Sequence, residues 1–210
     1  MNFGRSQTSN NGDVDLLNLQ KGDLLDLTKS APFLNRAIIA CGWKINKKIG
    51  EDNYDLDLSA FMLNDKGRVS RAKLGTRVVY FGQKMQEGIY LEEDNLTGND
   101  DDDDGDAERI HIDLKAIPQD VQAILFCVNI FEAPKRRQTF GAVRDAYIRL
   151  LDEDDNEREL LRFKLTEQAS NSTAVVFAKL FRQNGGWTFD AIGENHMVSD
   201  LNGLLIKYMG

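Results

Sequence analysis

The 210-residue chain has few of the residues that mark specialised protein classes. Its only two cysteines, Cys41 and Cys127, each lie within an apolar run, so we expect reduced core thiols and no disulfide framework. Three prolines and 17 glycines exclude a collagen-like or proline-rich chain. No apolar run approaches the roughly 20 residues that a bilayer-spanning helix needs, and residues 1–13 lack the apolar segment of a secretory signal. We therefore expect a cytoplasmic protein that does not insert into a membrane.

Basic residues are too few for a general nucleic-acid binder, because the chain has 26 basic and 34 acidic residues and a formal charge of −8. Removing seven carboxylates that crowd into nine positions would leave a charge of only −1. These seven are Asp100, Asp101, Asp102, Asp103, Asp104, Asp106 and Glu108. The acidity is therefore local, and it indicates either a solvated acidic loop or a site for a hard cation.

Short apolar runs with a two-residue alternation dominate the rest of the chain. Residues 54–63 are the clearest case, with Leu56, Leu58, Ala60 and Met62 on one side of the predicted strand. The predicted strands are 15–19, 23–27, 37–43, 54–63, 77–81, 109–114, 123–131, 146–151, 159–165, 174–182 and 187–192. This pattern predicts an all-β protein with few short helices, a β-sandwich of two mainly antiparallel sheets.

The polar composition of residues 1–14 predicts a disordered N-terminal arm, followed by a single domain over residues 15–210. Within that domain, residues 139–143 are expected to form a helical turn or loop, and residues 201–208 one short helix. Trp43 and Trp187 are predicted core residues.

Two aspartates in the predicted strand 54–63 suggest a metal site. Asp55 and Asp57 are two residues apart, so their side chains leave the same face about 6.6–7 Å apart at the backbone. Two ionised carboxylates this close repel each other unless a cation lies between them. The long acidic loop offers the further oxygens that calcium requires: Asp94, Asn95, Gly98, Asp104, Asp106 and Glu108.

The types of these ligands favour one metal. No cysteine or histidine cluster is present, which makes zinc an unsuitable ion, and an all-oxygen set favours Ca²⁺ over Mg²⁺. The EF-hand pattern fails, because Ala60 stands where that loop requires glycine and Lys66 where it requires glutamate.

Several segments, in this order, resemble the TerD family of tellurium-resistance and stress-response proteins. They are residues 18–22 (NLQKG), 41–43 (CGW), 55–61 (DLDLSAF), 94–98 (DNLTG) and 105–108 (GDAE). The resemblance covers about residues 16–193. It implies a β-sandwich that binds calcium through loops at one end, with roles in resistance to tellurite, other chemical stress and phage. It also implies multiprotein assemblies at the inner face of the membrane, and no catalytic activity is firmly attached to this domain.

Carried over position by position, the resemblance assigns calcium binding to Asp55, Asp57, Asp94, Asn95, Gly98, Asp104, Asp106 and Glu108. Two positions depart from the family pattern. Glu93 replaces a glycine before the Asp-Asn pair, and Ala107 replaces the second aspartate of a Gly-Asp-Asp-Glu segment. The aspartate run is also longer than usual, so one ligand is either lost or replaced by a neighbouring aspartate.

These observations predict a calcium-binding interaction module that is not an enzyme. Its expected partners are calcium and other stress-response proteins in a membrane-peripheral assembly, without nucleic acid. One alternative is a divalent-metal-dependent phosphoester hydrolase, although no phosphate loop is present and Ser59 is expected to be hydrogen-bonded within its strand. Another is a nucleotide-binding protein that uses the basic residues 135–137. A third is a metal-free scaffold with an acidic tail.

Overall fold

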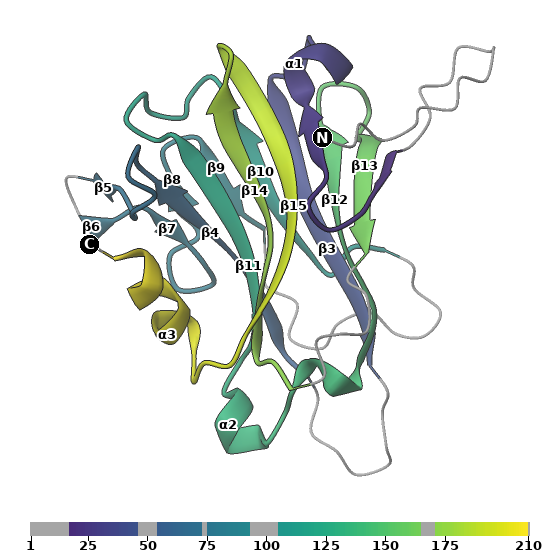
Figure 1. Cartoon of the computed structure of the whole chain (residues 1–210), viewed down its shortest axis with the longest axis vertical. Helices are drawn as coiled ribbons and strands as arrows, with labels where there is room; N and C mark the ends of the chain where they lie inside the picture. Colours follow the sequence, from purple (N-terminus) through teal and green to yellow (C-terminus); the bar gives the residue numbers. More distant parts are fainter. Residues whose placement is uncertain (1–16, 46–53, 73–74, 93–104, 165–170, 210) are drawn as a thin grey trace.

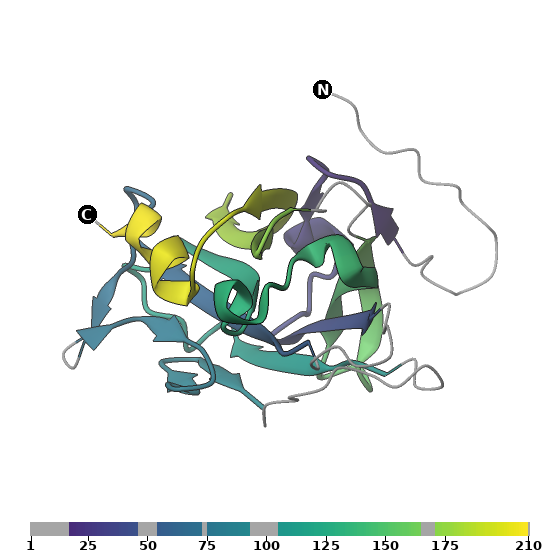
Figure 2. The same cartoon turned by 90° about the horizontal axis from the view of Figure 1, so that it is seen from below.

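The computed structural model describes residues 17–45, 54–72, 75–92, 105–164 and 171–209. Over these residues the chain forms two stacked, mainly antiparallel β-sheets with a few short helices (Figures 1 and 2). The predicted all-β sandwich is therefore confirmed. The predicted N-terminal arm, residues 1–14, lies outside the described residues.

The first sheet has seven strands in the order β1-β13-β12-β3-β10-β9-β8. Only β1 and β13 run parallel to each other, and the other neighbours pair antiparallel. The bounds are β1 Leu17–Leu19, β13 Arg158–Lys164, β12 Val143–Asp152, β3 Arg36–Ile45, β10 Glu108–Asp113, β9 Ile89–Leu91 and β8 Met85–Gln86.

The second sheet has six strands in the order β2-β15-β14-β11-β4-β7, all antiparallel. The bounds are β2 Leu24–Asp26, β15 Gly186–His196, β14 Ala174–Gln183, β11 Ala123–Ile130, β4 Leu56–Leu63 and β7 Val78–Val79, with β5 Arg71–Ala72 and β6 Gly75–Thr76 as a separate pair. A short turn joins β14 and β15. Asn184 and Gly185 both have positive φ there, as tight hairpin turns require.

A large core between the two sheets holds the sandwich together. Alternate residues of β4, from Leu56 to Met62, pack into this core as the alternation predicted. Trp43 and Trp187 belong to it from opposite sheets. Cys41 and Cys127 are fully buried in strands, and burial raises the pKa of both thiols, so neither resembles a reactive cysteine.

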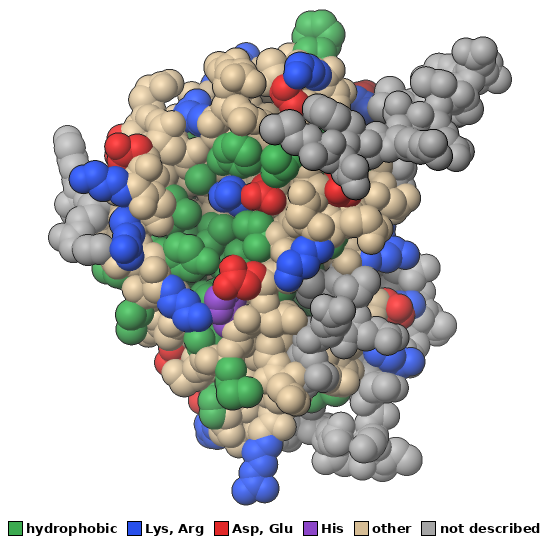
Figure 3. Space-filling view, viewed as in Figure 1, with side chains coloured by type: hydrophobic (Ala, Val, Ile, Leu, Met, Phe, Trp, Pro, Cys, Tyr) green, Lys and Arg blue, Asp and Glu red, His purple; other side chains and the backbone are tan. Residues whose placement is uncertain are grey.

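A second, smaller core lies on the outer face of the six-stranded sheet. Phe61 and Leu63 of β4 reach it, and helix α3 (Leu201–Leu205) and the 3₁₀ helix η3 (Ile206–Tyr208) cover it. Hydrophobic side chains accordingly gather on this face in Figure 3. The short helix predicted over residues 201–208 is thus confirmed as two short helical segments.

Several local elements differ from the prediction. The strand predicted over 23–27 ends at Asp26, because the Asp26 carboxylate accepts a hydrogen bond from Thr28 N (3.0 Å) and caps helix α1 (Leu27–Ser30). Helix α2 (Ala133–Arg136), with Pro134 in its first turn, was not predicted. The helical turn expected near residue 140 is confirmed as η1 (Phe140–Ala142).

Candidate functional site

Two buried carboxylates lie at the start of β4, at one end of the sandwich. Asp55 precedes the strand and is 8% exposed, and Asp57 is its second residue and is 3% exposed. Phe131 N donates a hydrogen bond to Asp55 O (2.8 Å), so the pairing with the β11 side continues to this residue. Because strand side chains alternate, Asp57 shares the outer face of the six-stranded sheet with Phe61.

Each aspartate has a polar neighbour, one on the adjacent strand β11 and one on helix α2. Asn129 lies opposite Asp57 in β11, and its Nδ2 donates to Asp57 Oδ2 (3.1 Å). Arg136 of α2 places Nη1 4.0 Å from Asp55 Oδ2, and its guanidinium lies over the ring of Phe131, 5.2 Å from the centroid. The negative charge at the start of β4 is therefore partly balanced from α2.

Glu108 joins this end from the opposite sheet. It is the first residue of β10, it is only 2% exposed, and its Oε2 accepts a hydrogen bond from Leu58 N (2.5 Å). Leu58 directly follows Asp57 in the chain. The fold therefore brings Asp55, Asp57 and Glu108 to the same end of the sandwich although Glu108 is 50 residues from Leu58.

The Asp106 carboxylate has other partners, on β12 of the seven-stranded sheet. Both of its carboxylate oxygens accept from Arg149 of β12, at 2.7 Å from Nε and 2.7 Å from Nη2. The hydroxyl of Tyr147 adds a third hydrogen bond to Asp106 Oδ1 (3.2 Å). In this structure Asp106 is therefore an ion-pair partner on the seven-stranded sheet, separate from the carboxylates of β4.

The remaining candidate ligands, Asp94, Asn95, Gly98 and Asp104, lie outside the described residues. The described chain leaves β9 at Glu92, whose N donates to Arg109 O (3.0 Å), and resumes at Gly105, three residues before Glu108. Glu92 and Gly105, the described residues on either side of 93–104, thus both lie near the first residues of β10.

The donor set suits calcium in its chemistry. The carboxylates of Asp55, Asp57 and Glu108 and the amide of Asn129 all offer oxygen, which calcium prefers. Over the parts of the chain that the structure describes, no group of three or more His, Cys, Asp or Glu side chains is close enough to hold a metal ion. A complete site therefore needs ligands from residues 93–104, and the predicted ligand list stays a prediction.

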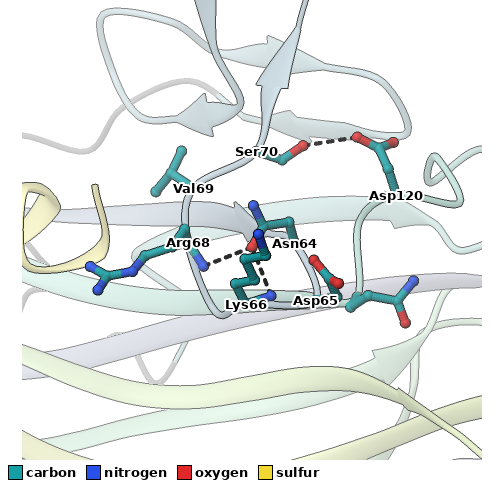
Figure 4. A pocket seen from close by; sticks show the side chains of 8 residues that line it. Asn64, Asp65, Lys66, Arg68, Val69, Ser70 and Asp120 are labelled. Atoms are coloured by element: carbon teal, nitrogen blue, oxygen red, sulfur yellow. Dashed lines mark hydrogen bonds between the residues drawn. The ribbon is translucent and has the colours of Figure 1, made fainter. Parts of the chain in front are cut away.

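A broad depression of about 1000 Å³ lies at the other end of β4, by the turn that follows Leu63 (Figure 4). Its polar groups largely bond to one another. Asn64 Oδ1 accepts from Lys66 N (2.9 Å) and Arg68 N (3.1 Å), and Ser70 Oγ donates to Asp120 Oδ2 (3.1 Å). None of the sequence-predicted site residues lies here, and these contacts fit a stabilised turn.

Sequence reasoning missed two residues that the fold adds to the carboxylates, Asn129 and Arg136. A signal for Asn129 was present, because it is the single strongly polar residue in the apolar run 123–131. Arg136 had no such signal, since its approach to Asp55 depends on how α2 follows β11.

No helix among the described residues is long and apolar enough to cross a membrane. The TerD domain family matches residues 16–208 of the chain. A tellurium resistance protein TerD of Alcaligenes is 41% identical over 178 residues, which cover 84% of this chain and 89% of the relative. General stress protein 16U of Bacillus subtilis is 36% identical over 183 residues, 86% of this chain and 91% of that protein.

A chemical-damaging agent resistance protein of Clostridium acetobutylicum is 50% identical over 100 residues, covering 48% of this chain and 69% of that protein. Among solved structures, a homologue of the telluride resistance protein TerD from Streptomyces coelicolor has a TM-score of 0.64 at 19% identity, covering 80% of this chain and 94% of that one, which supports the fold. The chain therefore belongs to the TerD family of tellurium-resistance, chemical-damage-resistance and stress-response proteins.

Proposed function

We propose that this protein is a calcium-binding interaction module of the response to tellurite and other chemical stress. The observation that carries the proposal is the burial of Asp55, Asp57 and Glu108, from opposite sheets, at one end of the sandwich. Buried carboxylates are costly unless a cation or hydrogen bonds compensate for the lost hydration. The acidic residues 100–104 precede Glu108 by only a few positions in the sequence and would supply further oxygen ligands.

Calcium bound here would supply positive charge that links β4, β10 and the acidic segment between β9 and β10. Asp55, Asp57 and Glu108 are its candidate ligands in the described part of the chain, and because they do not form a metal-holding group by themselves, ligands from residues 93–104 would complete the site. Such an ion would stabilise the folded state and order a surface at this end. We propose that this surface binds other stress-response proteins, in a cytoplasmic assembly at the periphery of the inner membrane.

We further propose that the module is not an enzyme. The Ser59 hydroxyl, which is the nearest candidate nucleophile in sequence, donates to Cys127 O of the neighbouring strand β11 (3.4 Å). Buried inside the sheet, this hydroxyl is a poor nucleophile for a phosphoester. A phosphoesterase of the two-metal type would also require two divalent ions about 3.5–4 Å apart.

The test is to add calcium or magnesium to metal-free protein, to measure binding by calorimetry, and to measure the unfolding midpoint by thermal unfolding. Calcium should raise the unfolding midpoint, and at 100 times the dissociation constant one site adds about 2.7 kcal/mol to the free energy of unfolding. Asp57→Asn should lose the calcium response, because it removes a charged ligand while keeping the size of the side chain and one acceptor oxygen for Asn129.

Asp65→Asn is the matched control, since Asp65 lies in the exposed turn at the far end of β4 and should leave calcium binding unchanged. Calcium binding by Asp57→Asn at the affinity of the unmodified protein would contradict the site. An equal response to magnesium would favour the phosphoesterase, and no response to either ion would favour a metal-free scaffold.

A further inference from the structure

A cavity of about 520 Å³ lies on the outer face of the six-stranded sheet, separate from the depression of Figure 4. The turn after β7, the start of α2 and helix α3 form its walls, and Asp57 and Asn129 of β4 and β11 contribute to its lining. We call it the aromatic pocket. Its volume falls in the range of small-molecule sites, about 300–1000 Å³.

One wall of the pocket is a chain of three aromatic rings. Phe81 contacts Tyr80 edge-to-face, with centroids 5.4 Å apart, and contacts Phe131 in the same manner at 5.7 Å. Phe81 is 40% exposed, which is high for a phenylalanine in a folded domain. Phe131 already attracts one cation, because the guanidinium of Arg136 lies 5.2 Å from its ring centroid.

The amide groups in the lining present acceptors. Gln83 Nε2 donates to Val78 O (2.6 Å) and Thr76 O (3.3 Å), so its carbonyl oxygen is the group left for a ligand. Asn129 donates to Asp57, and its Oδ1 is buried and accepts no hydrogen bond from any described residue. A buried carbonyl oxygen in this state favours a ligand that brings a hydrogen-bond donor.

The charged residues of the lining also favour such a ligand, and in addition a positive charge on it. Lys135, its one cationic residue, is paired with Glu132 (2.9 Å), and Asp200 caps α3 through Gly203 N (2.9 Å). The charged residues of the lining are three carboxylates, Asp57, Glu132 and Asp200, and one ammonium, Lys135, so its formal charge is negative. A site with aromatic rings, acceptor oxygens and net negative charge suits a cation and disfavours an anion such as a phosphate.

We infer that the aromatic pocket binds a small organic cation that carries N–H donors, a primary ammonium or a guanidinium. The ring wall would hold its apolar and cationic parts, and Asn129 Oδ1 and Gln83 Oε1 would accept its hydrogen bonds. This inference goes beyond the proposed calcium function and does not depend on it. Because Asp57 serves both proposals, the organic cation is to be measured in a calcium chelator.

The experiment is an NMR titration of ¹⁵N-labelled protein with n-butylammonium and ethylguanidinium. Saturable shifts should centre on the side-chain amides of Asn129 and Gln83. Tetramethylammonium has the charge without the donors and should bind at least about tenfold more weakly, the equivalent of one lost hydrogen bond. The neutral 1-pentanol should give no saturable shift.

Phe81→Leu and Phe131→Leu keep an apolar side chain and remove the ring, so each should weaken binding about 3- to 30-fold. Tyr90→Leu is the control, because Tyr90 is a similarly exposed aromatic residue (42%) that does not line the pocket. The dispersion of the amide spectrum verifies the fold of each variant.

The inference would be overturned by the absence of shifts at the pocket up to 50-fold excess of either cation, or by equal binding of 1-pentanol. An unchanged affinity in both phenylalanine variants would also overturn it. These outcomes are independent of the calcium proposal, whose readout is the calcium titration of the same protein.

Discussion

Asp106 and Glu108 are two positions apart, both acidic, and yet their side chains have unrelated partners. Glu108 accepts a backbone hydrogen bond from β4 of the opposite sheet, whereas Asp106 forms a two-point ion pair with Arg149. Planar pairing of this kind is among the stronger charge-assisted contacts in proteins. The sequence shows that this segment is acidic, but the role of each carboxylate depends on the side chains that other strands bring near it.

His196 gives a pH-dependent prediction at the same scale. Its Nδ1 lies 2.7 Å from Lys207 Nζ, and an ammonium can only donate, so the imidazole accepts and is neutral in this contact. Burial, and secondarily the charge of Lys207, lower the pKa of His196 below its usual value, while Glu194 acts in the opposite direction. The folded state thus disfavours protonation, so the stabilising contact is present above the unfolded pKa of about 6.5 and is lost as the pH falls through the folded value.

We therefore expect the unfolding midpoint to drop between pH 7.5 and pH 5 by more in the unmodified protein than in His196→Gln, which cannot titrate. Thermal unfolding at a series of pH values measures this difference. Lys207→Met should also reduce the pH dependence, since it removes the repelling charge. Identical pH profiles for the three proteins would show that His196 does not contribute.

At the scale of elements, β4 is the strand on which both cores depend. All eight of its residues are buried, because one face packs between the sheets and the other under α3. The alternation predicted the two faces of β4 but gave no reason to expect both to be covered. The short strands β5, β6, β8 and β9 were not predicted.

The cover provided by α3 leads to a stability prediction. Leu204 is completely buried in the second core, so Leu204→Ala should lower the free energy of unfolding by about 2–5 kcal/mol, the usual cost of such a cavity. Ile206→Ala, two residues away and 69% exposed, is the control and should cost less than about 1 kcal/mol. Urea unfolding measures both. Equal losses in the two variants would indicate that α3 does not seal this core.

At the scale of the whole molecule, the two sheets share one large core. Trp43 enters it from β3 of the seven-stranded sheet and Trp187 from β15 of the six-stranded sheet, as the sequence predicted for both. A continuous core of this kind favours all-or-none unfolding.

Single-tryptophan variants can test this cooperativity. Trp187→Phe leaves Trp43 as a fluorescent probe of one sheet, and Trp43→Phe leaves Trp187 as a probe of the other. Within each variant, the tryptophan fluorescence midpoint in urea should coincide with the far-ultraviolet circular dichroism midpoint, because separating the sheets would expose the large core that they share. Midpoints that separate within one variant would show that the sheets unfold in steps.

The sequence by itself determined the strand pattern, the two core tryptophans and the family, because alternation and ordered motifs are local properties of the chain. Only the tertiary structure decided which polar groups meet. Asn129 reaches Asp57 across 72 residues, Glu108 reaches Leu58 across 50, and Arg149 reaches Asp106 across 43. Contacts of that separation depend on strand order and register in two different sheets, which side-chain periodicity along one strand does not encode.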